Sequence, residues 1–135
     1  MTGVLVDSNI LLDIATNDPV WSSWSADQLR RAGQGARMVI NPIIYAELSV
    51  SHSRIEQLDA LLPDDVFHRE DLPGRAAFLA GKAYLGYRRR GGERRSPLPD
   101  FYIGAHAAIR GYRLLTRDRG RYATYFPTVD LISPQ

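Results

Sequence analysis

The sequence contains no cysteine, so neither a disulfide framework nor a metal site with thiolate ligands can form. It also has no stretch that approaches the roughly 20 consecutive apolar residues of a membrane-spanning helix. The apolar N-terminus is interrupted by Asp7, Asn9 and Asp13, and it lacks the basic start of a signal peptide. We therefore expect a cytoplasmic protein that has no membrane segment.

Lysine is nearly absent as well, since Lys82 is the single lysine among 17 basic residues. Codon usage in a GC-rich genome would produce such an imbalance without any functional cause. The distribution of the arginines is more informative, because residues 88–90 and then Arg94 and Arg95 form a short basic run. An arginine binds a phosphate through two parallel hydrogen bonds, which a lysine cannot do. The run predicts either a contact surface for a chain of phosphates or a solvated loop.

The 135 residues are enough for one domain with one hydrophobic core. Short β-branched runs alternate with longer helical stretches, which is typical of an α/β fold in which helices flank a parallel sheet of about five strands. Strands are predicted over residues 3–6, 38–40, 66–67, 112–115 and 129–132. Helices are predicted over residues 8–14, 19–32, 42–48, 53–62, 73–90 and 99–110. A polar loop is predicted over residues 91–96, and a short helical turn is predicted after residue 118.

Four acidic residues fall at similar positions in this pattern. Asp7 follows the first strand, and Glu47 lies on the helix after the second strand. Asp100 opens the helix that leads into the fourth strand, and Asp118 follows that strand. The carboxyl ends of parallel strands meet at one edge of a sheet, where ligands bind in such folds. We expect the four carboxylates to converge there, provided that the first and fourth strands are neighbours.

Each acid also has a purely structural interpretation. Asp7 and Asp118 could cap the helices that follow them, and Asp100 could complement a helix dipole. Glu47 lies within an apolar stretch, where a free carboxylate is costly to desolvate. Several crowded carboxylates repel one another, and a hard divalent cation such as Mg²⁺ or Mn²⁺ removes that penalty. A metal site explains the set better than four independent caps.

The ordered set of motifs resembles the PIN-domain nucleases, and within them the VapC toxins of bacterial and archaeal toxin–antitoxin pairs. The resemblance rests on residues 4–9 (VLVDSN), 44–48 (IYAEL), Asp100 and 114–118 (LLTRD). It continues through the C-terminal stretch to residue 132 and so covers nearly the whole chain. It implies a PIN-like parallel sheet flanked by helices and an acidic pocket that binds Mg²⁺ or Mn²⁺.

The resemblance also assigns roles to individual residues. The family's acidic quartet corresponds to Asp7, Glu47, Asp100 and Asp118, and whether Glu47 is a ligand or a general base stays open. Thr116 matches a hydroxyl position that would orient the last carboxylate or a water molecule, and Asn9 matches a polar position beside the first acid. Arg119, Gly120 and Arg121 follow Asp118 where some relatives carry a further acid, so one or two metal ions remain possible.

The resemblance implies an RNA substrate, a VapB-type antitoxin as partner and a homodimer. Candidate RNA contacts are Arg88, Arg89, Arg90, Arg94, Arg95 and Arg117. Trp21 and Trp24 belong either to an antitoxin groove or to the core. We predict a metal-dependent endoribonuclease that acts as a toxin; the alternatives are an RNA-binding PIN-like module without nuclease activity and a structure-specific DNA nuclease.

Two other acidic, Mg²⁺-binding folds fit less well. A phosphoryl-transfer receiver domain needs an acidic pair after the first strand and a lysine near the end of the chain, whereas Asp7 is followed by Ser8. A haloacid-dehalogenase-like phosphatase would need a second aspartate at position 9, which is Asn9.

Overall fold

The computed structural model of the protein describes residues 3–92 and 98–134. Its five strands form one parallel sheet in the order β3-β2-β1-β4-β5. The strands are β1 (Gly3–Val6), β2 (Arg37–Ile40), β3 (Phe67–Arg69), β4 (Arg113–Leu115) and β5 (Leu131–Ile132). The buried strand β1 lies between β2 and β4, which confirms that the first and fourth strands are neighbours.

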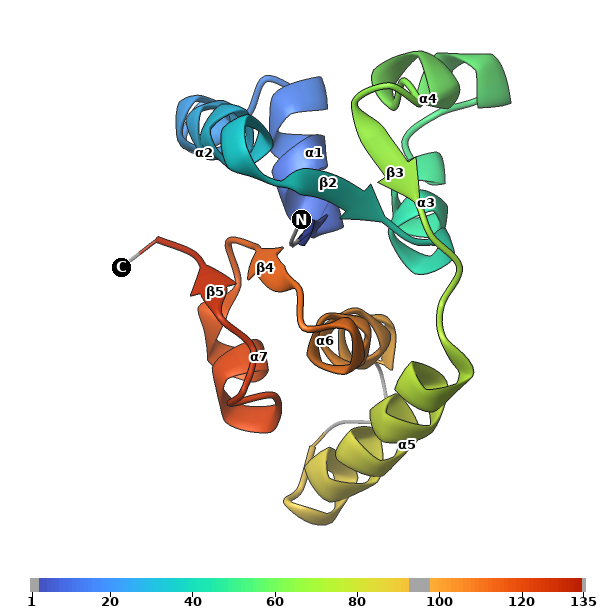
Figure 1. The fold of residues 1–135 in the computed structure, drawn as a ribbon, viewed down its shortest axis with the longest axis vertical. Coiled ribbons are helices and arrows are strands. Elements are labelled where there is room, and N and C mark those ends of the chain that lie inside the picture. The colour runs from blue at the N-terminus through green and yellow to red at the C-terminus, as the bar shows by residue number, and fades with distance from the viewer. Residues whose placement is uncertain (1–2, 93–97, 135) are drawn as a thin grey trace.

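Helices flank this sheet, as the α/β prediction requires. They are α1 (Ser8–Ala15), α2 (Ser22–Gly35), α3 (Pro42–Ser49), α4 (Ile55–Leu61), α5 (Gly74–Arg89), α6 (Leu98–Arg110) and α7 (Arg119–Tyr125). Figure 1 shows α1 and α2 together at one end of the molecule, while α5 runs beside α6 and extends away from the sheet. In the described part of the chain, no helix has the length and apolarity needed to cross a membrane.

The helix expected from Pro19 begins instead at Ser22. Residues 19–21 form a turn ahead of the helix, and Asp18 Oδ1 accepts the backbone N–H groups of Val20 and Trp21 in this turn at 2.9 and 2.8 Å. Aspartate side chains commonly satisfy backbone N–H groups at turns and just ahead of helices in this way. The expected start at Pro19 is therefore wrong by three residues.

Other elements differ from their predicted bounds only at the ends. Strand β3 ends two residues later than predicted, at Arg69, and β5 begins at Leu131 because Val129 takes part in a turn through a hydrogen bond to Phe126 O. Asn41 caps α3 by accepting the backbone N–H of Ile44. The polar loop expected over residues 91–96 lies mostly outside the described residues.

The packing of α6 against α7 brings two elements of the site together. Gly104 on α6 lies so close to the ring of Phe126 that a Cβ atom there would overlap the ring. The absence of a side chain at Gly104 therefore lets the end of α7 approach α6. This contact places the fully buried Tyr122 of α7 beneath the first turn of α6, where Asp100 lies.

Candidate active site

Asp7 is the centre of a hydrogen-bond network at the carboxyl end of β1. Its backbone N–H donates to Leu115 O at 2.9 Å and so continues the ladder between β1 and β4. Its side-chain Oδ2 accepts hydrogen bonds from Thr116 Oγ1 at 2.8 Å, Tyr122 Oη at 3.0 Å and Asn9 Nδ2 at 3.3 Å. These hydrogen bonds hold the carboxylate in place, and only 3% of the residue is exposed.

Burial raises the pKa of Asp7 from its usual 3.8 to about 7. The hydrogen bonds from Thr116 and Tyr122 work against this shift, whereas the negative charges of Asp100 and Glu47 add to it. The three groups that donate to Oδ2 are neutral, so they do not cancel the negative charge. Asp7 is therefore a buried carboxylate under repulsion from two others, and a nearby positive charge would relieve that repulsion.

Glu47 reaches the same site from α3. Its Oε1 accepts a hydrogen bond of 2.8 Å from the hydroxyl of Ser8, which also lies 3.5 Å from Asp7 Oδ1. Burial and the charge of Asp100 raise the pKa of Glu47, and the Ser8 hydrogen bond lowers it. Ser8 thus lies between two acids, a position that the sequence analysis did not assign to it.

Asp100 lies in the first turn of α6 and faces two residues of α7. Its Oδ1 is 3.5 Å from the hydroxyl of Tyr122, and its Oδ2 accepts a hydrogen bond of 2.5 Å from Arg121 Nη1. Burial raises the pKa of Asp100 in spite of the opposing effect of Arg121. The hydroxyl of Tyr122 therefore links Asp7 and Asp100, and burial beside these acids raises the pKa of Tyr122 well above its usual value.

Asp118 lies at the rim of the site, with 49% of its side chain exposed. It occupies the N-cap position of α7, although its side chain makes no capping hydrogen bond there. Its Oδ2 is 4.0 Å from Arg121 Nη1, and its negative charge contributes to the raised pKa of Asp100. The structure therefore brings Asp118 to the cluster from the solvent side.

Thr116 and Asn9 hold the first acid rather than the last one. The fully buried hydroxyl of Thr116 donates to Asp7 and accepts the backbone N–H of Asp118 at 3.0 Å. Thr116 thus contacts Asp7 and the backbone of Asp118, and its expected role in orienting the Asp118 carboxylate or a water molecule stays a prediction. Asn9 donates to Asp7, and its Oδ1 accepts the backbone N–H of Arg117 at 3.2 Å.

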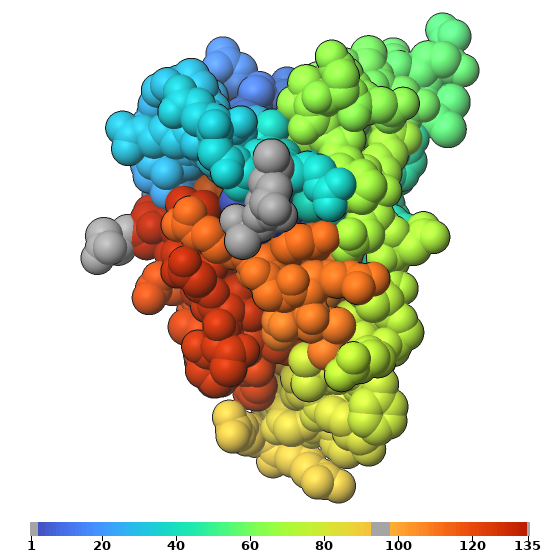
Figure 2. All heavy atoms as spheres, in the orientation of Figure 1, coloured from blue at the N-terminus to red at the C-terminus, as the bar shows by residue number. Residues whose placement is uncertain are grey.

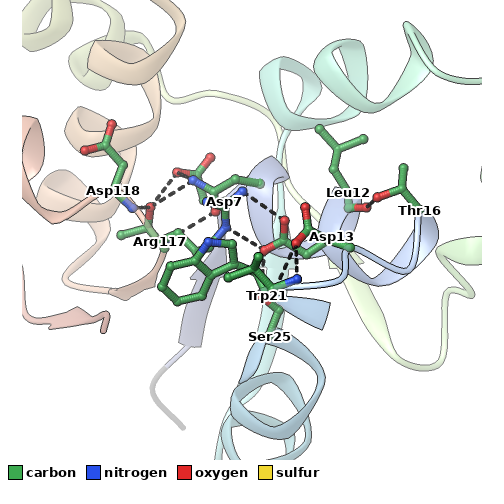
Figure 3. Close-up of polar contacts among 12 residues, drawn as sticks. Asp7, Leu12, Asp13, Thr16, Trp21, Ser25, Arg117 and Asp118 are labelled. Atoms are coloured by element: carbon green, nitrogen blue, oxygen red, sulfur yellow. Dashed lines mark hydrogen bonds and ion pairs between the residues drawn. The ribbon is translucent and has the colours of Figure 1, made fainter. Parts of the chain in front are cut away.

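The side chain of Arg117, an expected RNA contact, is directed at Asp13 of α1 (Figure 3). Its Nε and Nη2 bind the two carboxylate oxygens of Asp13 at 2.6 and 2.9 Å, and Asp13 is only 3% exposed. Ser25 donates a further hydrogen bond of 2.7 Å to Asp13. The ring of Trp21 covers the guanidinium, whose Cζ is 5.1 Å from the ring centroid. This arrangement fastens the loop that carries Thr116 and Asp118 to α1.

The other tryptophan, Trp24, packs against the hydrophobic core and contacts the Trp21 ring edge-on. Trp21 and Trp24 thus contribute to packing around the Arg117–Asp13 pair. Trp24 therefore fits the core interpretation, whereas Trp21 packs on the Arg117 guanidinium and on Trp24.

The expected arginine run lies partly at the C-terminal end of α5. Residues 88–90 are described there, whereas Arg94 and Arg95 lie outside the described residues. This end of α5 projects from the body of the molecule (Figure 2). Arg90 lies over the ring of Tyr125, with its Cζ 5.4 Å from the ring centroid, and Tyr125 packs against Phe101 beside Asp100. An aromatic cluster therefore joins the basic end of α5 to the acidic site.

Within residues 3–92 and 98–134, no three carboxylate or imidazole groups lie close enough together to enclose a metal ion. The chemistry of the site nevertheless fits a hard cation. Its donors are carboxylate oxygens, the kind of ligand that Mg²⁺ and Mn²⁺ prefer. Burial, and to a lesser degree repulsion from Asp100, raises the pKa values of Asp7 and Glu47, and a bound cation would offset both effects.

The fold and this site define a class: a parallel α/β protein with an acidic site at the carboxyl end of its central strand. The sequence profile of the PIN domain matches residues 4–127, and the chain belongs to the PIN-domain family. Members of this family are generally nucleases and usually use divalent metal ions. No curated protein gives a significant sequence match.

Solved structures with the same fold include chains of toxin–antitoxin complexes. A chain of VapBC2 from Rickettsia felis, bound to a promoter DNA fragment, has a TM-score of 0.75 and 17% identity, and the match covers 99% of this chain and 100% of that one. A chain of VapBC-1 from nontypeable Haemophilus influenzae has a TM-score of 0.72 and 19% identity, with 98% of both chains covered. A chain of DNA-bound VapBC from Salmonella typhimurium has a TM-score of 0.71 and 20% identity, with 98% of both covered.

Proposed function

We propose that this chain is a metal-dependent endoribonuclease and acts as the toxin of a toxin–antitoxin pair. One observation carries the nuclease part of the proposal: the buried carboxylate of Asp7, with a pKa of about 7, faces Asp100 and Glu47 at the carboxyl end of the central strand. A divalent cation bound by these carboxylates would offset their negative charge.

Asp7, Glu47 and Asp100 would hold the Mg²⁺ or Mn²⁺ ion, and Asp118 lies at the rim of the same acidic site. When bound, such an ion would stabilise the negative charge that develops on the attacked phosphate. The residues of the chain itself keep Asp7 in place through Thr116 and Tyr122. Glu47 serves as a ligand or as the base that takes the proton of the attacking water, and its raised pKa brings it closer to neutral pH in the second role.

The proposed partners follow from the likeness to solved complexes and from the charge distribution. The similar chains come from VapBC structures, which supports a VapB-type antitoxin as the inhibitor, and we propose a homodimer of this chain. RNA would approach over the arginine run at the end of α5, which the aromatic cluster connects to Asp100. Arginine contacts to phosphate position a nucleic acid without reading its sequence.

Purified protein incubated with total RNA in Mg²⁺ or Mn²⁺ is expected to produce discrete cuts with 5′-phosphate and 3′-hydroxyl ends. The cuts should disappear in EDTA and in the Asp7→Asn variant, because each removes the metal–carboxylate site. End mapping of the fragments by sequencing is the measurement. Asp64→Asn is the matched control, since Asp64 is exposed and its ion pair is with Arg69 rather than with a residue of the acidic site.

The same assay separates the alternatives. Binding of RNA without any cleavage, by folded protein loaded with metal, would favour an RNA-binding module. Cleavage of structured DNA in preference to RNA of the same sequence would favour a DNA nuclease. Either result would contradict the endoribonuclease proposal.

Replacing Arg88, Arg89 and Arg90 with alanine is expected to weaken RNA binding and to flatten its salt dependence. Each phosphate contact to a single strand contributes about 0.7 to the slope of log K against log salt, so the loss of three contacts should reduce the slope by about 2. Fluorescence anisotropy with a labelled RNA at several salt concentrations measures this slope.

The matched control for this variant replaces three exposed arginines away from α5, namely Arg30, Arg31 and Arg54, each of which pairs with an acid close to it in the sequence. That control should leave the slope unchanged. An unchanged slope in the α5 variant would remove the arginine run from the RNA-binding surface.

A further inference from the structure

The acidic site is divided into two halves by the carboxylate of Asp100. Oδ1 of Asp100 faces the hydroxyl of Tyr122, which also binds Asp7, whereas Oδ2 binds Arg121. In the first half, the described partners of Asp7 and Glu47 are neutral hydroxyl and amide groups. In the second half, a guanidinium lies against Asp100 and within 4.0 Å of Asp118.

The fold holds Arg121 in this place from several directions. Arg121 lies three residues after Asp118 on α7, one residue before the buried Tyr122. Its side chain is only 28% exposed, and its Cζ lies 5.9 Å from the centroid of the Tyr87 ring. A partly buried guanidinium that is fixed between an aromatic ring and a carboxylate loses little entropy on pairing. The contact with Asp100 is therefore more than a transient surface ion pair.

A second divalent ion would need the same oxygens. Two-metal nuclease sites place their ions about 3.5–4 Å apart and need ligands enough for both. On the side of Asp118, the carboxylates available are Asp118 and Oδ2 of Asp100, and the single positive charge of Arg121 already compensates part of their negative charge. A guanidinium and a divalent cation repel each other, so a fixed Arg121 opposes the binding of a second ion in this half of the site.

We propose that Arg121 takes the place of a second metal ion, so that the site binds one divalent cation, on the side of Asp7 and Glu47. This inference rests on the proposed metal-dependent function and deepens it. Arg121 supplies a permanent positive charge beside Asp100 and Asp118. The divalent ion is left to the half of the site in which the carboxylates are uncompensated.

The test counts bound Mn²⁺ by electron paramagnetic resonance after equilibrium dialysis, with no RNA present. Wild-type protein should bind one Mn²⁺ per chain. Arg121→Glu, which replaces the fixed cation with an additional ligand, should bind two. Arg121→Gln removes only the charge and should bind a second, weaker Mn²⁺. The matched control is Arg119→Glu, because Arg119 is exposed on the same helix and bonds to Ser133 instead of an acid; it should bind one.

Two Mn²⁺ ions per wild-type chain would overturn the proposal, and so would a single ion in both Arg121 variants when circular dichroism shows that they are folded. These outcomes leave the metal-dependent nuclease intact. Wild-type protein that binds no Mn²⁺ would instead remove the metal site itself, and the two failures are thereby distinguished.

Discussion

Replacing Asp7 with asparagine is expected to stabilise the metal-free protein at pH 8 while it abolishes RNA cleavage. The pKa of Asp7 is about 7 in the folded protein and 3.8 in an unfolded chain. A difference of roughly 3 pKa units corresponds to about 4 kcal/mol, which sets the upper end of the expected gain in unfolding free energy. Asparagine has no charge to desolvate and therefore avoids this cost.

The sign of the pH dependence follows from the raised pKa. Between about pH 4 and pH 7 the folded protein keeps a proton on Asp7 that the unfolded chain releases. The stability of the metal-free wild type therefore falls as the pH rises through this window and levels off above it. The gain from Asp7→Asn should be small at pH 4 and largest at pH 8, as measured by urea unfolding in EDTA.

The geometry of the site allows this substitution without loss of hydrogen bonds. The side-chain oxygen of asparagine can accept from Thr116, Tyr122 and Asn9 as Oδ2 does now. Its amide nitrogen then takes the position of Oδ1, 3.5 Å from the hydroxyl oxygen of Ser8, which can accept a hydrogen bond. The substitution removes the charge and preserves the shape.

Added Mn²⁺ provides the complementary measurement. A ligand that binds only the folded state raises the unfolding free energy, so Mn²⁺ should stabilise the wild type and have little effect on Asp7→Asn. Asp64→Asn, at an exposed position, should behave as wild type in both experiments. If Asp7→Asn were less stable than wild type at pH 8 in EDTA, the assignment of Asp7 as a strained cation ligand would be contradicted.

The sheet and the acidic edge could be predicted from the sequence because both depend on regular rules. Continuous apolar strands indicate a parallel sheet, and carboxyl ends of parallel strands meet at one edge. Asp7 follows β1 directly and Asp118 lies three residues after the end of β4, so their approach depends on β1 and β4 being neighbours. Predicting that Asp100 approaches the other acids required only the position of its helix relative to the same edge of the sheet.

The residues that complete the site could not be predicted in the same way. Tyr122 reaches Asp7 across 115 positions of the chain, and its direction is set by the packing of α7 against Gly104. Ser8 has the sequence signature of a helix start, and its contact with Glu47 depends on how α3 meets α1. Neither contact follows from local periodicity or spacing.

The partner of the Arg117 side chain could not be predicted from the sequence either. An arginine beside an acidic motif in a nuclease-like sequence favours a phosphate contact. In the structure its partner is Asp13 on α1, which is separated from it by 104 positions. A buried aspartate must find a partner, but the sequence does not show which cation supplies it.

Replacing Arg117 with methionine is expected to destabilise the protein by about 3 kcal/mol. Removing one partner of a buried ion pair leaves an uncompensated charge, at a cost of about 3–5 kcal/mol, and the partial exposure of Arg117 favours the lower end. Among the described residues, only the Ser25 side chain would still donate a hydrogen bond to the Asp13 carboxylate. Urea unfolding at pH 7 measures the loss, and Arg119→Met is the matched control because Arg119 is exposed.

A double-mutant cycle distinguishes this structural role from the RNA contact that the sequence favoured. The Asp13→Asn substitution removes the charge that Arg117 neutralises, so the double variant should lose less than the sum of the single losses, by about 2 kcal/mol. The salt slope of RNA binding should stay at the wild-type value in Arg117→Met under conditions where it is folded. A stable Arg117→Met variant with a reduced slope would mean that the guanidinium leaves Asp13 to bind RNA. The expected result would mean that the Arg117–Asp13 ion pair holds the loop that carries Thr116 and Asp118 against α1. Loss of Arg117 would then weaken the site by loosening this loop.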